Sequence, residues 1–182
     1  MEIFCDTCLL RPLIAGDAPQ LTMHANDRDV WLNLRDRFPH PYTEQDADAY
    51  IAMVVARTSR LSFGIVVNGE ACGTIGLVPG VDIARCTAEI GYWLGRRFWG
   101  KGIATHALVA VTEYAFATLE LERVFAEPFA QNAASCRVLA KAGYTVEGLM
   151  RRSAIKDGKV LDQYLYAAYR DRWTRVPIAP TA

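Results

Sequence analysis

The chain has 182 residues, of which 52% are apolar and 22% are charged. This composition is typical of folded globular domains and excludes the disordered and low-complexity classes. Lys plus Arg and Asp plus Glu number 20 each, so the formal net charge is zero and no bulk basic surface is available to drive nucleic-acid binding.

The first third of the chain predicts one strand and two helices. Alternating polar and apolar residues indicate a strand over 7–13, and a helix is expected from 16 to about 33. Two prolines make 38–42 a loop, and the Thr43/Asp46 spacing predicts a helix N-cap that begins a helix running to Ser59. The residues expected on the buried side of the first helix are Leu21, Met23, Val30 and Leu34.

The middle of the chain predicts a hairpin followed by a strand and a helix. Asn68-Gly69 is a strong turn signal between strands 61–67 and 71–78. A strand over 87–94 and an amphipathic helix over 103–118 come next.

The last third predicts a short strand over 123–127, a helix over 132–142, and a closing hairpin of two strands, 144–156 and 160–169, joined at Asp157-Gly158. The elements together predict one α/β (α+β) domain over residues 1–175 and a frayed tail over 176–182. Its mixed sheet has about seven mostly antiparallel strands and about four flanking helices.

Five cysteines, an odd and scattered set, predict free thiols in a reducing compartment. The Cys5-x-x-Cys8 spacing suggests zinc or redox chemistry, but no second Cys/His pair follows at ligand spacing, so ordinary thiols are the better interpretation. The three histidines lack metal-ligand spacing, so no metal is expected. No apolar stretch reaches about 18 residues and no signal peptide is recognisable, so we expect a cytoplasmic protein that does not cross a membrane.

The segment 88–105 (AEIGYWLGRRFWGKGIAT) carries the chemistry. A strand leads into a tight turn at Gly100-Lys101-Gly102, and a helix begins at once, so backbone N–H groups and the helix N-terminus can hold phosphate. The alternative is a helix that starts at a glycine turn and binds no phosphate. The P-loop pattern fails because Gly102 follows Lys101, and the dinucleotide fingerprint fails because Thr105 stands where a third glycine is needed.

Arg97-x-x-Gly100-x-Gly102 resembles the (Gln/Arg)-x-x-Gly-x-(Gly/Ala) motif of the GCN5-related N-acetyltransferase (GNAT) superfamily. Residues 88–94 resemble the strand of that family that pairs with the pantetheine arm. Residues 132–135 (NAAS) and 138–144 (VLAKAGY) resemble its second cofactor motif. Glu147-Gly148, Arg151 and the region 156–162 resemble the closing hairpin of the Rim-type branch, which includes ribosomal-protein N-terminal acetyltransferases. The resemblance covers roughly residues 6–170.

The resemblance implies a GNAT fold with a sheet splayed between its fourth and fifth strands and acetyl-coenzyme A as co-substrate. The residues that it implies in cofactor binding are Tyr92, Trp93, Leu94, Arg97, Trp99, Gly100, Lys101, Gly102, Ile103, Ala104, Thr105, Asn132 and Ser135. Tyr144 is expected to pack against the cofactor.

Amine acetylation needs a proton acceptor for the attacking ammonium group. Glu89 in the fourth strand and Glu127 at the end of the fifth are both candidates. The alternative for either is a solvated carboxylate or an ion-pair partner of Arg97 or Arg123.

The departing thiolate would benefit from an acid. Many superfamily members carry a tyrosine seven residues after the motif asparagine, where this chain has Leu139, so Ser135 is the available hydroxyl. Its alternative role is a helix hydroxyl that bonds back to a carbonyl.

These features predict an acetyl-CoA-dependent N-acetyltransferase that works by direct transfer in a ternary complex. The acceptor is a protein or peptide N-terminal α-amine or a primary amine on a small molecule, and no nucleic acid or membrane partner is expected. A homodimer is compatible with these features. The loop 38–42 either lines the acceptor groove, as such loops do in this superfamily, or simply connects two helices. The alternative from another class is a non-catalytic acyl-CoA sensor.

Overall fold

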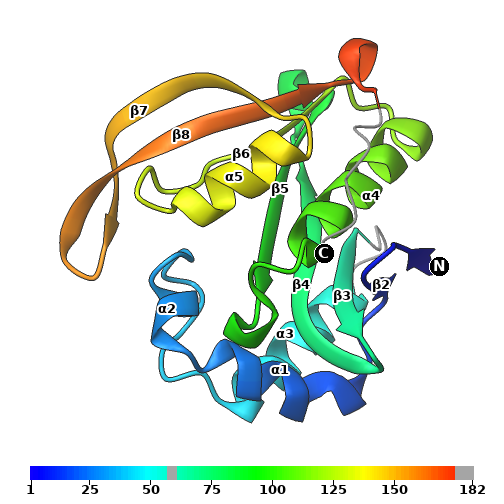
Figure 1. The fold of residues 1–182 in the computed structure, drawn as a ribbon, viewed down its shortest axis with the longest axis vertical. Coiled ribbons are helices and arrows are strands. Elements are labelled where there is room, and N and C mark those ends of the chain that lie inside the picture. The colour runs from blue at the N-terminus through cyan, green and yellow to red at the C-terminus, as the bar shows by residue number, and fades with distance from the viewer. Residues whose placement is uncertain (57–60, 175–182) are drawn as a thin grey trace. The chain divides into compact units, whose positions relative to one another are not determined.

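The computed structural model of the chain describes residues 1–56 and 61–174. Eight strands form one sheet in the order β1-β2-β3-β4-β5-β6-β8-β7 (Figure 1). β5 and β6 run parallel, whereas β1–β2, β2–β3, β3–β4, β6–β8 and β7–β8 are antiparallel. The strands are β1 (Ile3–Phe4), β2 (Leu9–Arg11), β3 (Ser62–Val67), β4 (Glu70–Pro79), β5 (Thr87–Leu94), β6 (Arg123–Ala126), β7 (Thr145–Lys156) and β8 (Lys159–Tyr169).

The strand predicted over 7–13 is present but shorter, as β2, and a further strand that was not predicted, β1, comes before it. Residues 5–8 make a turn in which the Cys5 N–H donates to the Cys8 carbonyl at 2.9 Å. The chain before this turn, β1, pairs with β2 through Ile3↔Leu10 and Phe4↔Leu9. The predicted fold class, α/β with a mostly antiparallel sheet, is confirmed.

The α-helices are α1 (Ala18–Ala25), α2 (Arg28–Trp31), α3 (Glu44–Ala56), α4 (Ile103–Thr118) and α5 (Ala133–Lys141). Short 3₁₀ turns are η1 (Ala15–Asp17), η2 (Asp82–Ala84), η3 (Arg96–Phe98) and η4 (Arg170–Arg172). The single helix predicted over 16–33 is therefore wrong. It is divided because the Asp27 carboxylate accepts from the N–H groups of Asp29 and Val30 and so begins a new helix.

Burial on this segment follows the prediction only in part. Leu21 and Val30 are buried, but Met23 is 58% exposed and Leu34 is only half-buried. The Thr43/Asp46 cap is confirmed, since the Thr43 N–H donates to Asp46 Oδ2 at 2.8 Å and the Asp46 N–H to Thr43 Oγ1 at 3.3 Å. The predicted helix end at Ser59 and the predicted tail over 176–182 lie outside the described residues.

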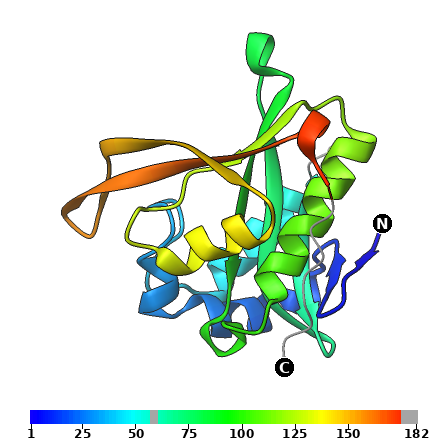
Figure 2. The same ribbon diagram turned by 45° about the horizontal axis from the view of Figure 1, so that its top comes forward.

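Both predicted hairpin turns are confirmed. Asn68 and Gly69 have φ of 51° and 82°, and Asp157 and Gly158 have φ of 50° and 72°, the left-handed pair that a tight two-residue hairpin turn requires. A third connection, between β4 and β5, is a narrow loop that contains η2 and is closed by a bond from the Gly80 N–H to the Thr87 carbonyl (Figure 2).

The chain divides into two compact units. Unit 1 consists of residues 1–76 and 92–107, and unit 2 of residues 77–91 and 108–182. In unit 1, α1 and α3 pack on each other and on Val66 and Ala71 at the hairpin of β3 and β4. In unit 2, β7 and β8 form a long hairpin, and α5 lies beside β8 (Figures 1 and 2).

Candidate functional site

The end of β5 is fixed in unit 1 by a close approach to β4. A Cβ on Gly73 would lie 2.2 Å from the Trp93 carbonyl oxygen, so only glycine permits this contact. The Gly95 N–H donates to the Cys72 carbonyl at 2.7 Å. Leu94 is buried, whereas the half-buried Trp93 ring packs edge-on against Phe38 at 5.6 Å. The half-buried Tyr92 precedes them in the same strand.

The two ends of the loop 38–42 pack against the core of unit 1, whereas His40 and Pro41 between them are exposed. The Phe38 and Tyr42 rings stack with their centroids 4.7 Å apart, and Tyr42 is only 5% exposed. This supports the interpretation of the loop as a packed connector.

After β5 the chain makes the short turn η3 and returns toward its start. The Trp99 indole N–H donates to the Leu94 carbonyl at 2.6 Å, which closes residues 94–99 into a loop. Trp99 is still 41% exposed. This loop therefore fixes the direction in which the chain enters the glycine turn.

The glycine turn has the conformation that its sequence predicts. Gly100 and Gly102 both have φ of 75°, where L side chains are strained, and nothing lies within 4 Å of the place where a Cβ of Gly100 would be. The Gly102 carbonyl accepts from the His106 N–H at 3.0 Å, so α4 begins directly after the turn. The N–H groups of Ile103, Ala104 and Thr105 belong to the first helical turn, which has no carbonyl partners within the helix. Together with Lys101, these groups suit an anion such as a pyrophosphate.

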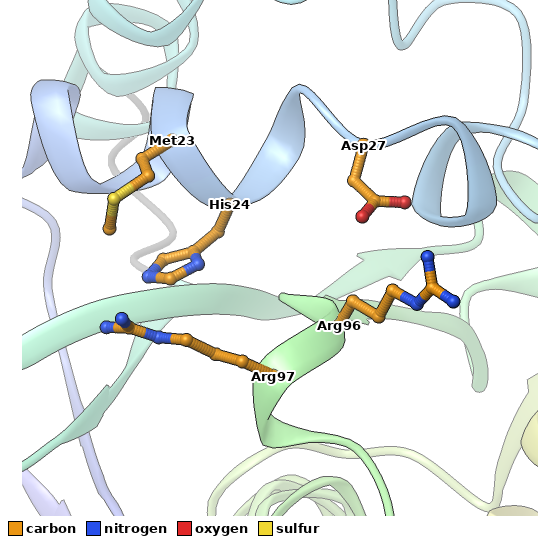
Figure 3. Close-up of a pocket in the computed structure, with 5 residues that line it drawn as sticks. All are labelled: Met23, His24, Asp27, Arg96 and Arg97. Carbon is orange, nitrogen blue, oxygen red and sulfur yellow. The ribbon is translucent and has the colours of Figure 1, made fainter.

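Arg97, the first residue of the motif, pairs with Glu70 at the start of β4. Figure 3 shows that Arg97 and Arg96 leave η3 in opposite directions. They line a hollow of about 400 Å³ together with Met23 and His24 of α1 and Asp27. Arg96 bonds to the Asp29 carboxylate at 2.8 Å.

In unit 2, the ladder between β5 and β6 is short. It consists of Thr87↔Arg123, Ala88↔Val124 and Glu89↔Phe125, and β5 continues to Leu94 beyond it. The half-buried Glu89 therefore occupies the last pair of this ladder.

Glu127 follows the end of β6, and hydrogen bonds to the backbone hold this segment in place. Its carbonyl accepts from the Gln163 side-chain amide at 3.0 Å, and the Tyr164 N–H donates to the Pro128 carbonyl at 3.0 Å, so this segment runs along β8. Arg123, named as an alternative partner for the glutamates, pairs with Glu147 of β7.

Asn132 and Ser135 are brought together at the start of α5. Asn132 is the N-cap, and its side-chain oxygen accepts from the Ser135 N–H at 3.0 Å. The helix that carries Ser135 is thus held by the motif asparagine. Tyr144, expected near the cofactor, is 3% exposed, and its hydroxyl lies 2.6 Å from that of Thr112.

Two residues near these sites are not indicated by any local sequence pattern. Glu70 holds Arg97 from 27 residues away, and Gln163 holds the Glu127 backbone from 36 residues away. Glu70 follows the Asn68-Gly69 turn, which fixes its strand, but no local pattern links it to Arg97. Within residues 1–56 and 61–174, no group of His, Cys, Asp and Glu side chains could hold a metal ion, and no helix is long and apolar enough to cross a bilayer.

The comparisons with known proteins agree with this geometry. Residues 8–145 match the family described as "Acetyltransferase (GNAT) domain". The N-acetyltransferase YjcK of Bacillus subtilis is 33% identical over 168 residues, 88% of this chain and 93% of YjcK. The [ribosomal protein uS5]-alanine N-acetyltransferase of Escherichia coli is 32% identical over 85 residues, 47% of this chain and 44% of that enzyme.

A solved structure of RimL, a ribosomal L7/L12 α-N-protein acetyltransferase in complex with coenzyme A, has the same fold. Its TM-score is 0.81 at 22% identity, covering 93% of this chain and 98% of RimL. The chain belongs to the GNAT acetyltransferase family. It is an acetyl-CoA-dependent N-acetyltransferase, and the comparisons do not favour a non-catalytic sensor.

Proposed function

We propose that this N-acetyltransferase acetylates the α-amine of a peptide or protein N-terminus by direct attack in a ternary complex. The observation that carries the cofactor half of the proposal is the unit of β5, η3, the glycine turn and α4, with φ of 75° at Gly100 and Gly102. The acceptor half is supported by the relatives named above, two of which act on ribosomal proteins.

In this proposal the backbone N–H groups of 100–105 hold the pyrophosphate of acetyl-CoA. Residues 92–94 of β5, beyond the last pair of the β5–β6 ladder, pair with the pantetheine amides, and Trp99 lies beside the turn. Asn132 and Ser135, at the start of α5 in unit 2, are included because the family resemblance implies them in cofactor binding. A phosphate site made of backbone N–H groups needs no metal, because the N–H groups of the turn and the helix supply the positive potential.

Glu89 is the proton acceptor that we favour, acting through water. It occupies the last pair of the ladder between β5 and β6, and it is half-buried. Glu127, which follows β6, is the second candidate, and we expect it to act mainly in binding the acceptor. A carboxylate in either place takes up the proton that the α-ammonium group must lose before it attacks the thioester.

Ser135 is proposed to donate a hydrogen bond to the thiol sulfur as negative charge develops there. Its placement in the first turn of α5, held by Asn132, supports this role. A helix N-terminus also favours negative charge nearby, which acts in the same direction.

The test is release of coenzyme A thiol with a matched panel of acceptors. We expect turnover with peptides that have a free N-terminal Ala or Ser, and none with the same peptides already acetylated at the N-terminus. Turnover on free polyamines or amino acids, with none on peptides, would replace the peptide acceptor by a small-molecule amine. Absence of thiol release with every amine would overturn the proposed activity.

A further inference from the structure

Arg97 is part of a three-residue cluster that no motif includes. Glu70 Oε1 accepts from His24 Nε2 at 2.6 Å, and the same oxygen pairs with Arg97 Nη2. His24 is 6% exposed, so one buried and one surface side chain share a single carboxylate oxygen. The cluster therefore connects α1, the start of β4 and η3 within unit 1.

His24 also contacts η3 directly. A Cβ on Gly95 would lie 2.8 Å from the His24 ring, so this glycine permits α1 to approach the loop. The Phe98 ring meets the His24 ring edge-on, with centroids 5.3 Å apart. The position of α1 is itself fixed, because Gln20 Oε1, one turn earlier, accepts from the Ala71 N–H at 2.7 Å.

The charges of the cluster decide what Arg97 can do. The hydrogen bond from His24 and the charge of Arg97 lower the pKa of Glu70, so its carboxylate is ionised at neutral pH. An anion that approaches the Arg97 guanidinium therefore meets the negative charge of Glu70 at the same place. Figure 3 shows the Arg97 side chain extended beneath His24, and Arg96 directed toward Asp27.

We propose that Glu70 and His24 are positioning residues for the glycine turn, and that Arg97 serves cofactor binding as a brace between β4 and η3, not as a ligand of the pyrophosphate. The inference rests on the proposed role of residues 100–105. In this arrangement Glu70 holds Arg97, Arg97 holds η3, and η3 sets the direction in which the chain enters Gly100. The backbone N–H groups remain the groups that touch the phosphate.

The test is a double-mutant cycle on the dissociation constant of coenzyme A, measured by calorimetry on folded protein. Glu70→Ala and Arg97→Ala should each weaken binding about 10-fold, and the double variant should be no weaker than Glu70→Ala, because both single changes remove the same Arg97–Glu70 contact. Arg97→Ala should also keep the wild-type salt dependence of the affinity, since no phosphate contact is lost. Asp29→Asn is the matched control: it removes the partner of Arg96 on the same turn and should leave the affinity unchanged.

A direct contact between Arg97 and phosphate predicts the opposite pattern. Glu70→Ala would then free the guanidinium and leave the affinity unchanged or tighter, while Arg97→Ala would weaken binding and reduce its salt dependence. That result would overturn the proposal that Arg97 acts as a brace. If Glu70→Ala does not fold, Glu70→Gln replaces it in the cycle, because it keeps the shape and loses the charge. Failure of wild-type protein to bind coenzyme A would instead contradict the proposed function.

Discussion

At the residue scale, Glu89 of β5 and Glu127 after β6 are proposed to have different roles. Glu89→Gln should lower kcat about 100-fold at neutral pH, and the deficit should shrink as the pH rises, because free amine then accumulates without a base. Glu127→Gln should act mainly on the KM of the acceptor. Steady-state kinetics across a pH series measures both. A larger loss of kcat for Glu127→Gln than for Glu89→Gln would reverse the assignment.

Ser135 is expected to contribute modestly, because a thiol with a pKa of about 8.5 is already a fair leaving group near neutral pH. Ser135→Ala should lower kcat about 3- to 30-fold, the effect of one hydrogen bond to a developing charge. The acetyl-CoA dissociation constant, measured beside kcat, should be nearly unchanged. If kcat does not change, Ser135 is only a helix residue, and if cofactor binding is lost with it, Ser135 serves to position α5.

At the scale of elements, Gly95, the residue before η3, lies against His24 of α1. Gly95→Ala would place a Cβ 2.8 Å from the buried His24 ring. The free energy of unfolding should fall by about 1–3 kcal/mol, the usual cost of overpacking, and coenzyme A binding should weaken as well. Chemical denaturation measures the change. Gly16→Ala is the matched control, since nothing lies within 4 Å of its Cβ position, and equal losses in both variants would contradict the contact.

The elements that sequence predicts well are those with local signals. β5 (Thr87–Leu94) and α4 (Ile103–Thr118) have the predicted bounds, because apolar periodicity and a glycine turn both act over a few residues. The division between α1 and α2 was missed, although Asp27 is a residue type that begins helices. Whether Asp27 lies inside a helix or caps one depends on the packing of unit 1. The spacing of apolar residues carries no information about that packing.

The candidate site likewise has features that local sequence predicts and features that it does not. The glycine turn and the Asn132 cap follow from local sequence, since each is decided by backbone conformation within four residues. The partners of Arg97 could not be predicted, because Glu70 and His24 come from other elements and are joined to it only by the fold. The sequence therefore predicts candidate binding residues, whereas the residues that hold Arg97 are seen only in the structure.

For the molecule as a whole, four described carboxylates have a lowered pKa and contribute to the response to acid; at exposed Asp46 the cause is hydrogen bonds from Thr43. Burial acts against ionisation of Asp17, but hydrogen bonds from Arg11 and the Ile14 N–H outweigh it and lower its pKa. His24 lowers the pKa of Glu70, and Arg123 that of Glu147. Since the folded pKa values lie below the unfolded ones, the stabilisation is complete at neutral pH and is lost as the pH falls below about 4–5 and through the folded values.

The melting temperature should therefore fall steeply on acidification, and Asp17→Asn should make its pH dependence shallower. That variant should also lose about 1–3 kcal/mol at neutral pH, because Arg11 keeps its place without a charged partner. Thermal melts of both proteins over a pH series measure this. Parallel pH profiles for wild type and Asp17→Asn would show that the Arg11–Asp17 pair contributes nothing to the acid response.

The central claim is that the turn from Gly100 to Thr105 holds acetyl-CoA, and its most direct test is the acetyl-CoA dissociation constant of wild type and of Gly102→Asp. The aspartate adds a side chain at φ of 75° and a negative charge where phosphate is expected. Calorimetry should give a micromolar value for wild type, about −8 kcal/mol, and at least about 30-fold weaker binding for the variant. The same affinity in a folded Gly102→Asp variant would contradict the account.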